Sequence, residues 1–204
     1  MSNLPKGFRG SAIAAGLKSS GALDLTLIVN EGPCFDAAAV YTTNKVVAAP
    51  VIWSREVTKG KLVRAAVLNS GGANACTGPQ GFADTHQTAE KVGDLIGISS
   101  GEVVVCSTGL IGELLPMPKI ISGLESIAST LTTDSLDDVS RAIMTTDSVP
   151  KVATSKLNGV EFAGIAKGVL AKTDLSSIPM KQAGICVQLR LNARSTRSAG
   201  LSRF

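Results

Sequence analysis

The sequence predicts an α/β or α+β fold in which helices flank mixed β-sheets. Short runs rich in Val, Ile and Leu, typical of buried strands, alternate with longer segments that have the spacing of amphipathic helices. Asn158-Gly159 separates two arms of alternating polarity and so predicts a hairpin with a two-residue turn. No repeat with a period of roughly 20–50 residues is present, which argues against a solenoid or a propeller.

Five strands are expected ahead of the hairpin because of their β-branched and aliphatic residues. They cover residues 21–32, 37–46, 49–54, 61–70 and 102–107. In the first of them, alternation places Leu25, Leu27 and Val29 on one face. That face is therefore expected to enter the core.

Three helices are expected, over residues 82–98, 116–131 and 135–147. The apolar face of the first would carry Phe82, Ala89, Val92 and Ile96. Gly97 lies near its end, as is common for a helix C-terminus. The third opens with Ser135 as N-cap, followed by two aspartates whose charges suit a first helical turn.

The chain has 204 residues, of which 44% are hydrophobic and 18% charged, enough for one domain with a sizeable core. We expect this domain to cover residues 1–168 and a divergent, basic, flexible tail to cover residues 169–204. The net charge of +4 arises in the tail, which holds six basic residues and one acidic residue. A basic face for nucleic acid is therefore not expected.

Four cysteines without a CxxC pair, and a single histidine, argue against a metal site. The first residues lack the apolar stretch of a signal peptide, and no apolar run approaches the roughly 20 residues of a membrane span. We therefore expect a cytoplasmic protein with reduced thiols and no membrane partner.

A glycine-rich segment, NSGGANACTG, begins at the end of the strand expected at 61–70. Glycines allow positive φ and let backbone amides approach a ligand. A tight turn around a buried Cys76 is the simpler interpretation, because a glycine-rich loop alone is a weak signal. The alternative is a ligand-binding module without catalysis.

The strand expected at 102–107 leads directly into the sequence Cys-Ser-Thr-Gly. Small residues there can turn backbone N–H groups and a hydroxyl outward, as an oxyanion hole requires. Cys106 is a candidate nucleophile, but no histidine lies near it in sequence, and a buried structural thiol is the commoner case.

Two later segments carry polar residues with more than one interpretation. AIMTTDSVPK holds two threonines and an aspartate, which suit either the capping of a helix end or contacts to a polar substrate. In AGIAKG, Lys167 would either pair with a carboxylate or stay in solvent. His86, in the middle of a predicted helix, is interpreted as a surface or packing residue.

Taken together and in this order, these segments resemble the α part of the ornithine acetyltransferase / glutamate N-acetyltransferase family of arginine biosynthesis. The resemblance covers roughly residues 5–168. It is carried by NSGGANACTG, CSTGLIGELLPM, AIMTTDSVPK and GIAKG, by the opening PKGFRGSAIAAGLKSSGALDLTLIVNEGP and by AAAVYTTNKVVAAPV. Each motif alone is modest, but the set is highly specific.

The resemblance implies a four-layer α-β-β-α fold and a chain that cuts itself into α and β parts, which form an αβ heterodimer or heterotetramer. It implies that a threonine exposed at the start of β takes an acetyl group from N-acetylornithine and passes it to glutamate. No cofactor is implied, although acetyl-CoA serves some members as a co-substrate. Thr108 and Gly109 match the family's oxyanion-stabilising pair, and Thr145 and Lys167 match its substrate contacts.

The chain departs from the family after Gly168. The family's Ala-Thr-Met-Leu segment, where the cut falls before the threonine, does not occur. Thr173 lies too early, whereas Ser177 lies nearly at the expected place and is the candidate stand-in for the nucleophile. The change at Val169 suggests a frameshift or truncation, so the alternative to an active acetyltransferase is a catalytically inactive α-part fragment or scaffold.

Overall fold

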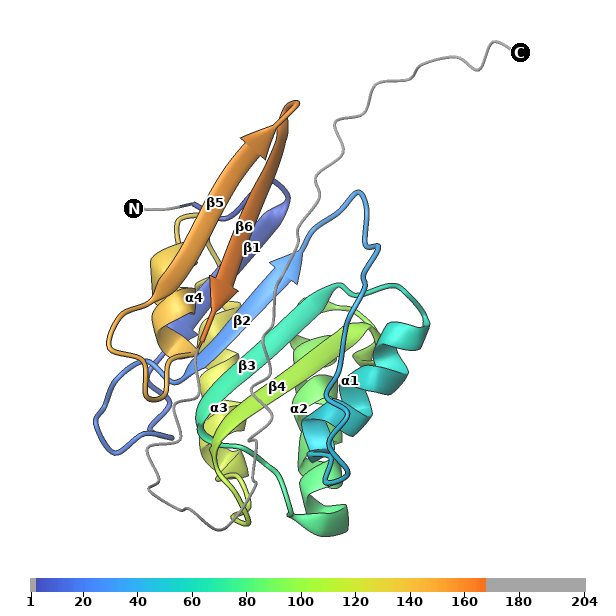
Figure 1. Cartoon of the computed structure of the whole chain (residues 1–204), viewed down its shortest axis with the longest axis vertical. Coiled ribbons are helices and arrows are strands. Elements are labelled where there is room, and N and C mark those ends of the chain that lie inside the picture. Colours follow the sequence, from blue (N-terminus) through green and yellow to red (C-terminus); the bar gives the residue numbers. More distant parts are fainter. Residues whose placement is uncertain (1–2, 168–204) are drawn as a thin grey trace.

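The computed structural model describes residues 3–167, and its centre is a four-stranded mixed sheet (Figure 1). The strands lie in the order β1-β2-β3-β4. They are β1 Phe8–Ile13, β2 Leu25–Asn30, β3 Ala65–Gly72 and β4 Val103–Leu110. The first two pairings are antiparallel and the third, between β3 and β4, is parallel, so the glycine-rich ends of β3 and β4 lie side by side.

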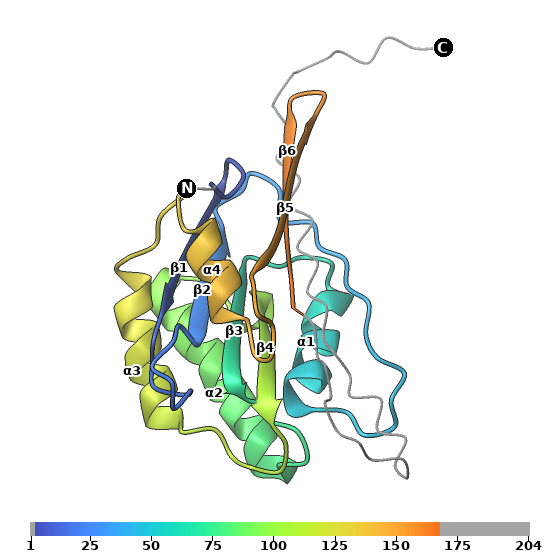
Figure 2. The ribbon, with the colours of Figure 1, turned by 60° about the vertical axis from the view of Figure 1, so that its left-hand side comes forward.

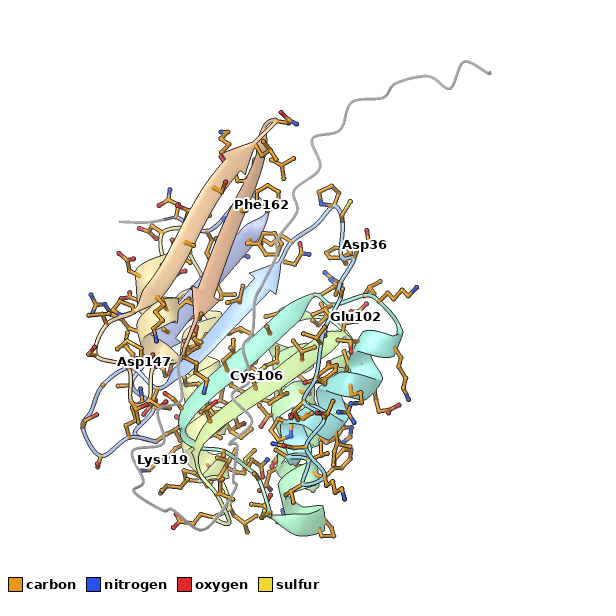
Figure 3. The ribbon with its side chains drawn as sticks, in the orientation of Figure 1. Asp36, Glu102, Cys106, Lys119, Asp147 and Phe162 are labelled. Atoms are coloured by element: carbon orange, nitrogen blue, oxygen red, sulfur yellow. The ribbon has the colours of Figure 1, made fainter. Side chains whose placement is uncertain are left out.

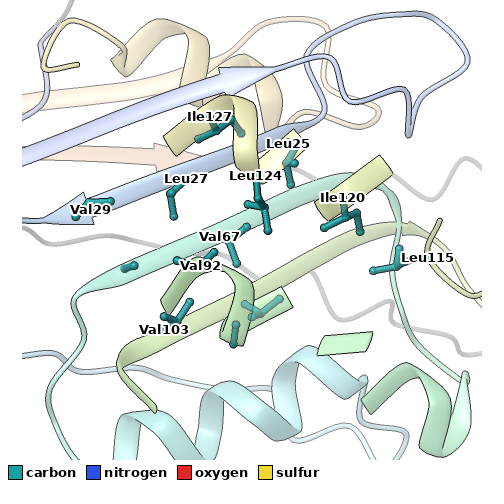
Figure 4. Packing of buried hydrophobic residues seen from close by; sticks show 13 residues of the cluster. Leu25, Leu27, Val29, Val67, Val92, Val103, Leu115, Ile120, Leu124 and Ile127 are labelled. Atoms are coloured by element: carbon teal, nitrogen blue, oxygen red, sulfur yellow. The ribbon is translucent and has the colours of Figure 1, made fainter. Parts of the chain in front are cut away.

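Helices α2 (Gly78–Ile96) and α3 (Met117–Ala128) cover one face of this sheet. The main hydrophobic core lies between these helices and the sheet. Leu25, Leu27 and Val29 all belong to it, which confirms the predicted inward face of β2. Figure 4 shows the strand residues beneath the helical ones. The helical members at 0% exposure are Ala89, Val92, Leu124 and Ile127.

The opposite face carries helix α4 (Leu136–Ala142) and a hairpin of β5 (Lys151–Leu157) and β6 (Val160–Ala166). A second, smaller cluster there joins Ile28 and Leu68 of the sheet to Ile165 of the hairpin. Figure 2 shows the hairpin tip projecting beyond the main sheet. A helix layer, the main sheet and a second small sheet thus follow one another, which confirms mixed sheets flanked by helices.

Helix α1 (Ala49–Lys59) lies along β4 and closes part of its outer edge. The Ser54 hydroxyl donates to the Val105 carbonyl and accepts from the Val105 N–H, both at 2.9 Å. The Trp53 indole donates to the Val103 carbonyl at 2.9 Å. Side chains of a helix thereby take the place of a fifth strand over this stretch, which protects the edge from pairing with another chain.

Two predicted strands are wrong. Residues 49–54 begin helix α1, because Pro50 suits a first helical turn and Val51, Ser54 and Val57 recur at helical spacing as buried residues. Residues 37–46 form no strand: the nearest pairing is a single bridge between Asp36 and Leu62, and Val40 is 93% exposed. β-prone residues need a partner strand, and none of the described residues supplies one there.

Most other boundaries agree with the sequence, but the third predicted helix ends at Ala142 instead of residue 147. The Asn158-Gly159 turn has φ values of 50° and 79°, as a two-residue hairpin turn requires, and Gly97 ends α2 at φ 70°. Ser135 is the N-cap of α4, although its hydroxyl donates to the Thr132 carbonyl rather than capping the helix. Phe82 is 39% exposed instead of buried, since Thr85 and Thr88 take the inward positions beside it. Strand β1 was not predicted.

Candidate functional site

The ends of β3 and β4 meet at a backbone contact that only glycine permits. Gly71 pairs with Gly109, and Gly72 then pairs with both Thr108 and Leu110, so the register shifts at this point. Gly109 has φ +147°, and a Cβ there would lie 2.3 Å from the carbonyl carbon of Gly71. The two backbones therefore approach more closely than any side chain allows.

The alternation along β4 determines where the N–H of Gly109 points. Val105 directs its backbone groups outward to Ser54, whereas Leu110 directs its carbonyl inward to the Ala73 N–H at 2.8 Å. Odd-numbered residues of β4 thus face the outer edge, and Gly109 is one of them. From this alternation we infer that the Gly109 N–H points away from β3, beyond the stretch that α1 closes. Thr108 lies partly buried next to it.

Lys167, directly after β6, has a buried amine instead of the solvated one that its local sequence suggests. Its Nζ has no hydrogen-bond partner among residues 3–167. Burial lowers the pKa of this amine to about 8; the interactions with Cys106 and Asp147 act in the opposite direction, and Lys18 adds a smaller lowering. The structure therefore brings Lys167 near Cys106 of β4 and near the loop that holds Asp147. Figure 3 labels Cys106 and Asp147.

Cys106 lies on the same face of β4 as Val104, packed against the smaller core cluster. Burial raises the pKa of its thiol to about 12, and the nearby Lys167 only partly opposes this. A thiol with this pKa is neutral at pH 7 and therefore a poor nucleophile. The environment of Cys106 favours a structural role.

The loop between α4 and β5 carries Thr145 and Asp147. The Asp147 side chain is only 3% exposed and forms an ion pair with Lys151 at the start of β5. Thr145 is partly buried two residues earlier. Because the charge of Asp147 acts on Lys167, this loop and the end of β6 form one polar region on the sheet face that carries Cys106.

The glycine-rich segment 69–78 is held by its own side chains. Asn74 is fully buried at φ 47°, and its amide donates to the Gly81 carbonyl at 2.7 Å and to the Thr85 hydroxyl at 2.9 Å. Thr77 donates to the Asn74 side-chain carbonyl at 2.7 Å. These bonds fix the start of α2, so the turn interpretation describes this part, but Cys76 is exposed and its predicted burial is wrong.

His86 agrees with its interpretation from the sequence, whereas two buried carboxylates stand out only in the structure. His86 is partly exposed on α2, 4.9 Å from the Trp53 ring, in agreement with a surface or packing role. Asp24 was not singled out and Asp147 was noted only as part of AIMTTDSVPK, although both are nearly or fully buried carboxylates. The signal for Asp24 was present: it is the one charged residue in the apolar run 22–29. Ser177 and residues 169–204 lie outside the described residues.

None of the helices within residues 3–167 combines the length and the apolar character that a membrane crossing needs. Over the same residues, no group of three or more His, Cys, Asp or Glu side chains is placed to hold a metal ion.

Comparison with known proteins assigns the chain and its fold to a family. Residues 9–171 match the ArgJ family. The chain belongs to the ArgJ family. The matched segment contains Thr108, Gly109, Thr145 and Lys167, so all four lie in the part that this chain shares with its relatives.

Curated ArgJ relatives extend well beyond the matched segment. The arginine biosynthesis bifunctional protein ArgJ of Streptomyces coelicolor is 54% identical over 163 residues, which are 80% of this chain and 43% of the relative. The protein of the same name from Mycobacterium tuberculosis is 51% identical over 172 residues, with the same coverage of 80% and 43%. This chain therefore spans less than half the length of these ArgJ proteins.

Two solved structures share the fold. An ornithine acetyltransferase complexed with ornithine, from Mycobacterium tuberculosis, superposes with a TM-score of 0.79 at 48% identity, covering 81% of this chain and 90% of that chain. An arginine biosynthesis bifunctional protein ArgJ from Bacillus halodurans gives 0.74 at 37% identity, covering 82% and 91%. The arrangement of helices and sheets described above is therefore that of solved ArgJ chains.

Proposed function

We propose that this chain supplies the α part of an acetyltransferase of arginine biosynthesis, which moves an acetyl group from N-acetylornithine to glutamate, with acetyl-CoA as a possible second donor and no cofactor. The single observation that carries the proposal is an ArgJ fold in which an outward N–H at Gly109 and a buried amine at Lys167 sit on neighbouring elements. The free thiols of Cys34, Cys76 and Cys106 suit a cytoplasmic location.

Thr108 and Gly109 are proposed to stabilise the oxyanion. Acetyl transfer passes through a tetrahedral intermediate with a negative oxygen, and donors fixed in advance lower its energy by about 3–4 kcal/mol. The Gly109 N–H is fixed by the glycine contact with Gly71, and the Thr108 hydroxyl is the second donor. A site of this kind needs no movement when charge develops on the carbonyl.

Lys167 and Thr145 are proposed to bind the substrate. N-acetylornithine and glutamate both carry an α-carboxylate, and a buried ammonium without a hydrogen-bond partner in residues 3–167 gains most from such a group. Thr145 lies in the loop whose Asp147 acts electrostatically on Lys167. A carboxylate bound there would raise the pKa of the amine back toward its ordinary value.

The attacking group is proposed to come from a β part rather than from residues 3–167. Cys106 has a thiol pKa of about 12, and the single histidine, His86, lies on α2, which covers the opposite face of the sheet. A threonine at the start of a β chain can use its own amine as base, so it needs no histidine. Ser177 is the weaker candidate for the same role. The assembly would be an αβ heterodimer or heterotetramer.

The test compares the full chain alone with the full chain plus the β part of a close ArgJ relative. Mass spectrometry of the chain alone should show no acetyl transfer from N-acetylornithine to glutamate, and the mixture should restore transfer. Lys167→Met should raise the KM of the restored enzyme for N-acetylornithine by about tenfold or more, whereas Lys45→Met, at an exposed lysine, should leave it unchanged. If the chain binds the β part but the complex transfers no acetyl group, the chain is instead an inactive scaffold.

A further inference from the structure

Asp24, just ahead of β2, holds a loop in place with its carboxylate. It is fully buried, and its two oxygens accept the backbone N–H groups of Ala15 at 2.7 Å, Leu17 at 2.6 Å and Lys18 at 3.0 Å. Bonds from N–H groups to a carboxylate are stronger than those between neutral groups. The Asp24 carboxylate therefore holds residues 15–18 in addition to the packing of Ala15 and Leu17 against the main core.

The loop held by Asp24 lies directly against the glycine contact of β3 and β4. A Cβ on Gly71 would lie 2.7 Å from the Leu17 carbonyl oxygen, and a Cβ on Gly109 would lie 2.3 Å from the Gly71 carbonyl carbon. Three backbone segments are thus stacked without intervening side chains. A displacement of Leu17 has no soft side chain to absorb it before it reaches Gly109.

Asp24 also reaches this stack through its own backbone. Its carbonyl accepts the N–H of Ser70 at 2.8 Å, immediately before Gly71, and the Ala73 N–H after the glycines donates to Leu110 at 2.8 Å. One residue thus bonds both the supporting loop and the strand that carries the glycine pair.

We propose that Asp24 is a positioning residue for the Thr108–Gly109 pair, acting through residues 15–18 and Gly71. The catalytic meaning of this inference rests on the proposed function, but the mechanical coupling of the three backbone segments to Asp24 does not depend on it. Asn is the most informative substitution because it has the same shape as Asp. Its NH2 group takes the place of one carboxylate oxygen and cannot accept the backbone N–H that this oxygen accepts.

The coupling is tested by amide hydrogen exchange of the full chain, comparing Asp24→Asn with the unaltered protein. The amides of Leu17, Ser70 and Ala73 should exchange about tenfold faster or more in the variant, because each bond in the stack is loosened. The amide of Asn30, bonded to the Arg64 carbonyl at 2.8 Å at the far end of the sheet, should not change beyond the global stability shift. Asp94→Asn, at an exposed aspartate, is the matched control and should change none of them.

Faster exchange at Leu17 alone, with Ser70 and Ala73 unchanged, would overturn the coupling, because it would confine the effect of Asp24 to its own loop. If Asp24→Asn does not fold, the unaltered chain is measured at rising, sub-denaturing urea. The three amides should then open together, with one free energy and one urea dependence that differ from those of Asn30. Separate opening of Leu17 and Ala73 would count equally against the proposal.

An activity measurement on the chain combined with a β part separates this inference from the proposed function. Asp24→Asn should lower kcat by about tenfold while the KM for N-acetylornithine stays within about twofold, since the oxyanion donors move but the substrate contacts do not. A rise in KM with unchanged kcat would overturn the positioning role. If the unaltered pair transfers no acetyl group, the proposed function fails, and the exchange result alone decides the coupling.

Discussion

The two faces of the main sheet are built from the same strands but differ in the side chains that cover them. On the face covered by α2 and α3, Leu25, Leu27 and Val103 join Leu124 in the larger of the two hydrophobic clusters. On the other face the cluster is smaller, and a buried amine and a nearly buried carboxylate lie at its border with Cys106. Alternation along each strand is what keeps the two chemistries apart.

The difference teaches which face stabilises the fold. Burying one aliphatic side chain contributes about 1.5–3 kcal/mol, whereas a buried charged group without a hydrogen bond costs energy. The apolar face can therefore offset the unfavourable burial of Lys167 on the other face. A site that keeps a buried amine available for a carboxylate depends on the stabilisation that the apolar face contributes.

The largest expected effect comes from the apolar face. Leu124→Ala removes a fully buried side chain of α3 and leaves a cavity against Leu25, so the free energy of unfolding should fall by about 3–5 kcal/mol. Urea denaturation followed by circular dichroism measures this. Leu157→Ala, at a residue 62% exposed near the hairpin tip, should cost less than about 0.5 kcal/mol, and an equal loss at both positions would show that the core does not lie where we place it.

A smaller but more local effect is expected at the glycine contact. Gly109→Ala forces a residue with φ +147° to carry a Cβ 2.3 Å from Gly71, which should cost about 2–4 kcal/mol and displace the end of β4. Gly112→Ala is the matched control, because φ is +87° but its Cβ would meet nothing within 4 Å. If urea denaturation gives the same loss for both variants, the backbone contact is not close.

The smallest effect concerns the polar face and is a dependence on pH. Lys167→Met should raise the free energy of unfolding at pH 7 by about 1 kcal/mol, since it removes a buried charge. The amine has a pKa of about 8 in the folded chain against an ordinary 10.5, so the unfolded chain binds more protons between these values. Stability of the unaltered protein should therefore rise with pH above 8, and the advantage of the variant should shrink.

This pH measurement is cleanest between pH 7 and 9. The Cys106 thiol has a raised pKa, from 9.0 to about 12, so its own contribution has the opposite sign and develops mainly above pH 9. Lys45→Met, at an exposed lysine, should track the unaltered protein throughout. A gain at pH 7 that does not shrink by pH 9 would mean that Lys167 is not a buried cation.

Local patterns predicted the elements whose signals are complete within a few residues. Alternation found β2 and its inward face, and Asn158-Gly159 found the hairpin, because both depend on neighbours in sequence. Helix α1 was missed since its first six residues are as rich in Val, Ile and Trp as a strand, and only their packing against β4 decides the matter. Strand β1 was missed because Gly10 and Ser11 weaken its pattern, and its pairing with β2 supplies what the sequence lacks.

The site was predicted in part. The resemblance selected Thr108, Gly109 and Lys167, and the structure places them at the ends of neighbouring elements, although their roles stay predictions. Burial of the Lys167 amine could not be foreseen, because it depends on where β6 ends relative to Cys106. Asp24 was overlooked for the same reason: its three N–H donors belong to a loop that only the folded chain brings to it.

The most direct test of the proposed division of labour is to locate the acetyl group itself. The full chain and a β part of an ArgJ relative are mixed with N-acetylornithine without glutamate, quenched, and digested for mass spectrometry, so that the acyl-enzyme is caught. We expect the acetyl group on the first residue of the β part and none on residues 3–167, with less of it formed when the chain carries Gly109→Ala. An acetyl group on Cys106, or on any serine or threonine of residues 3–167, would contradict the proposal that this chain supplies the oxyanion site and not the attacking group.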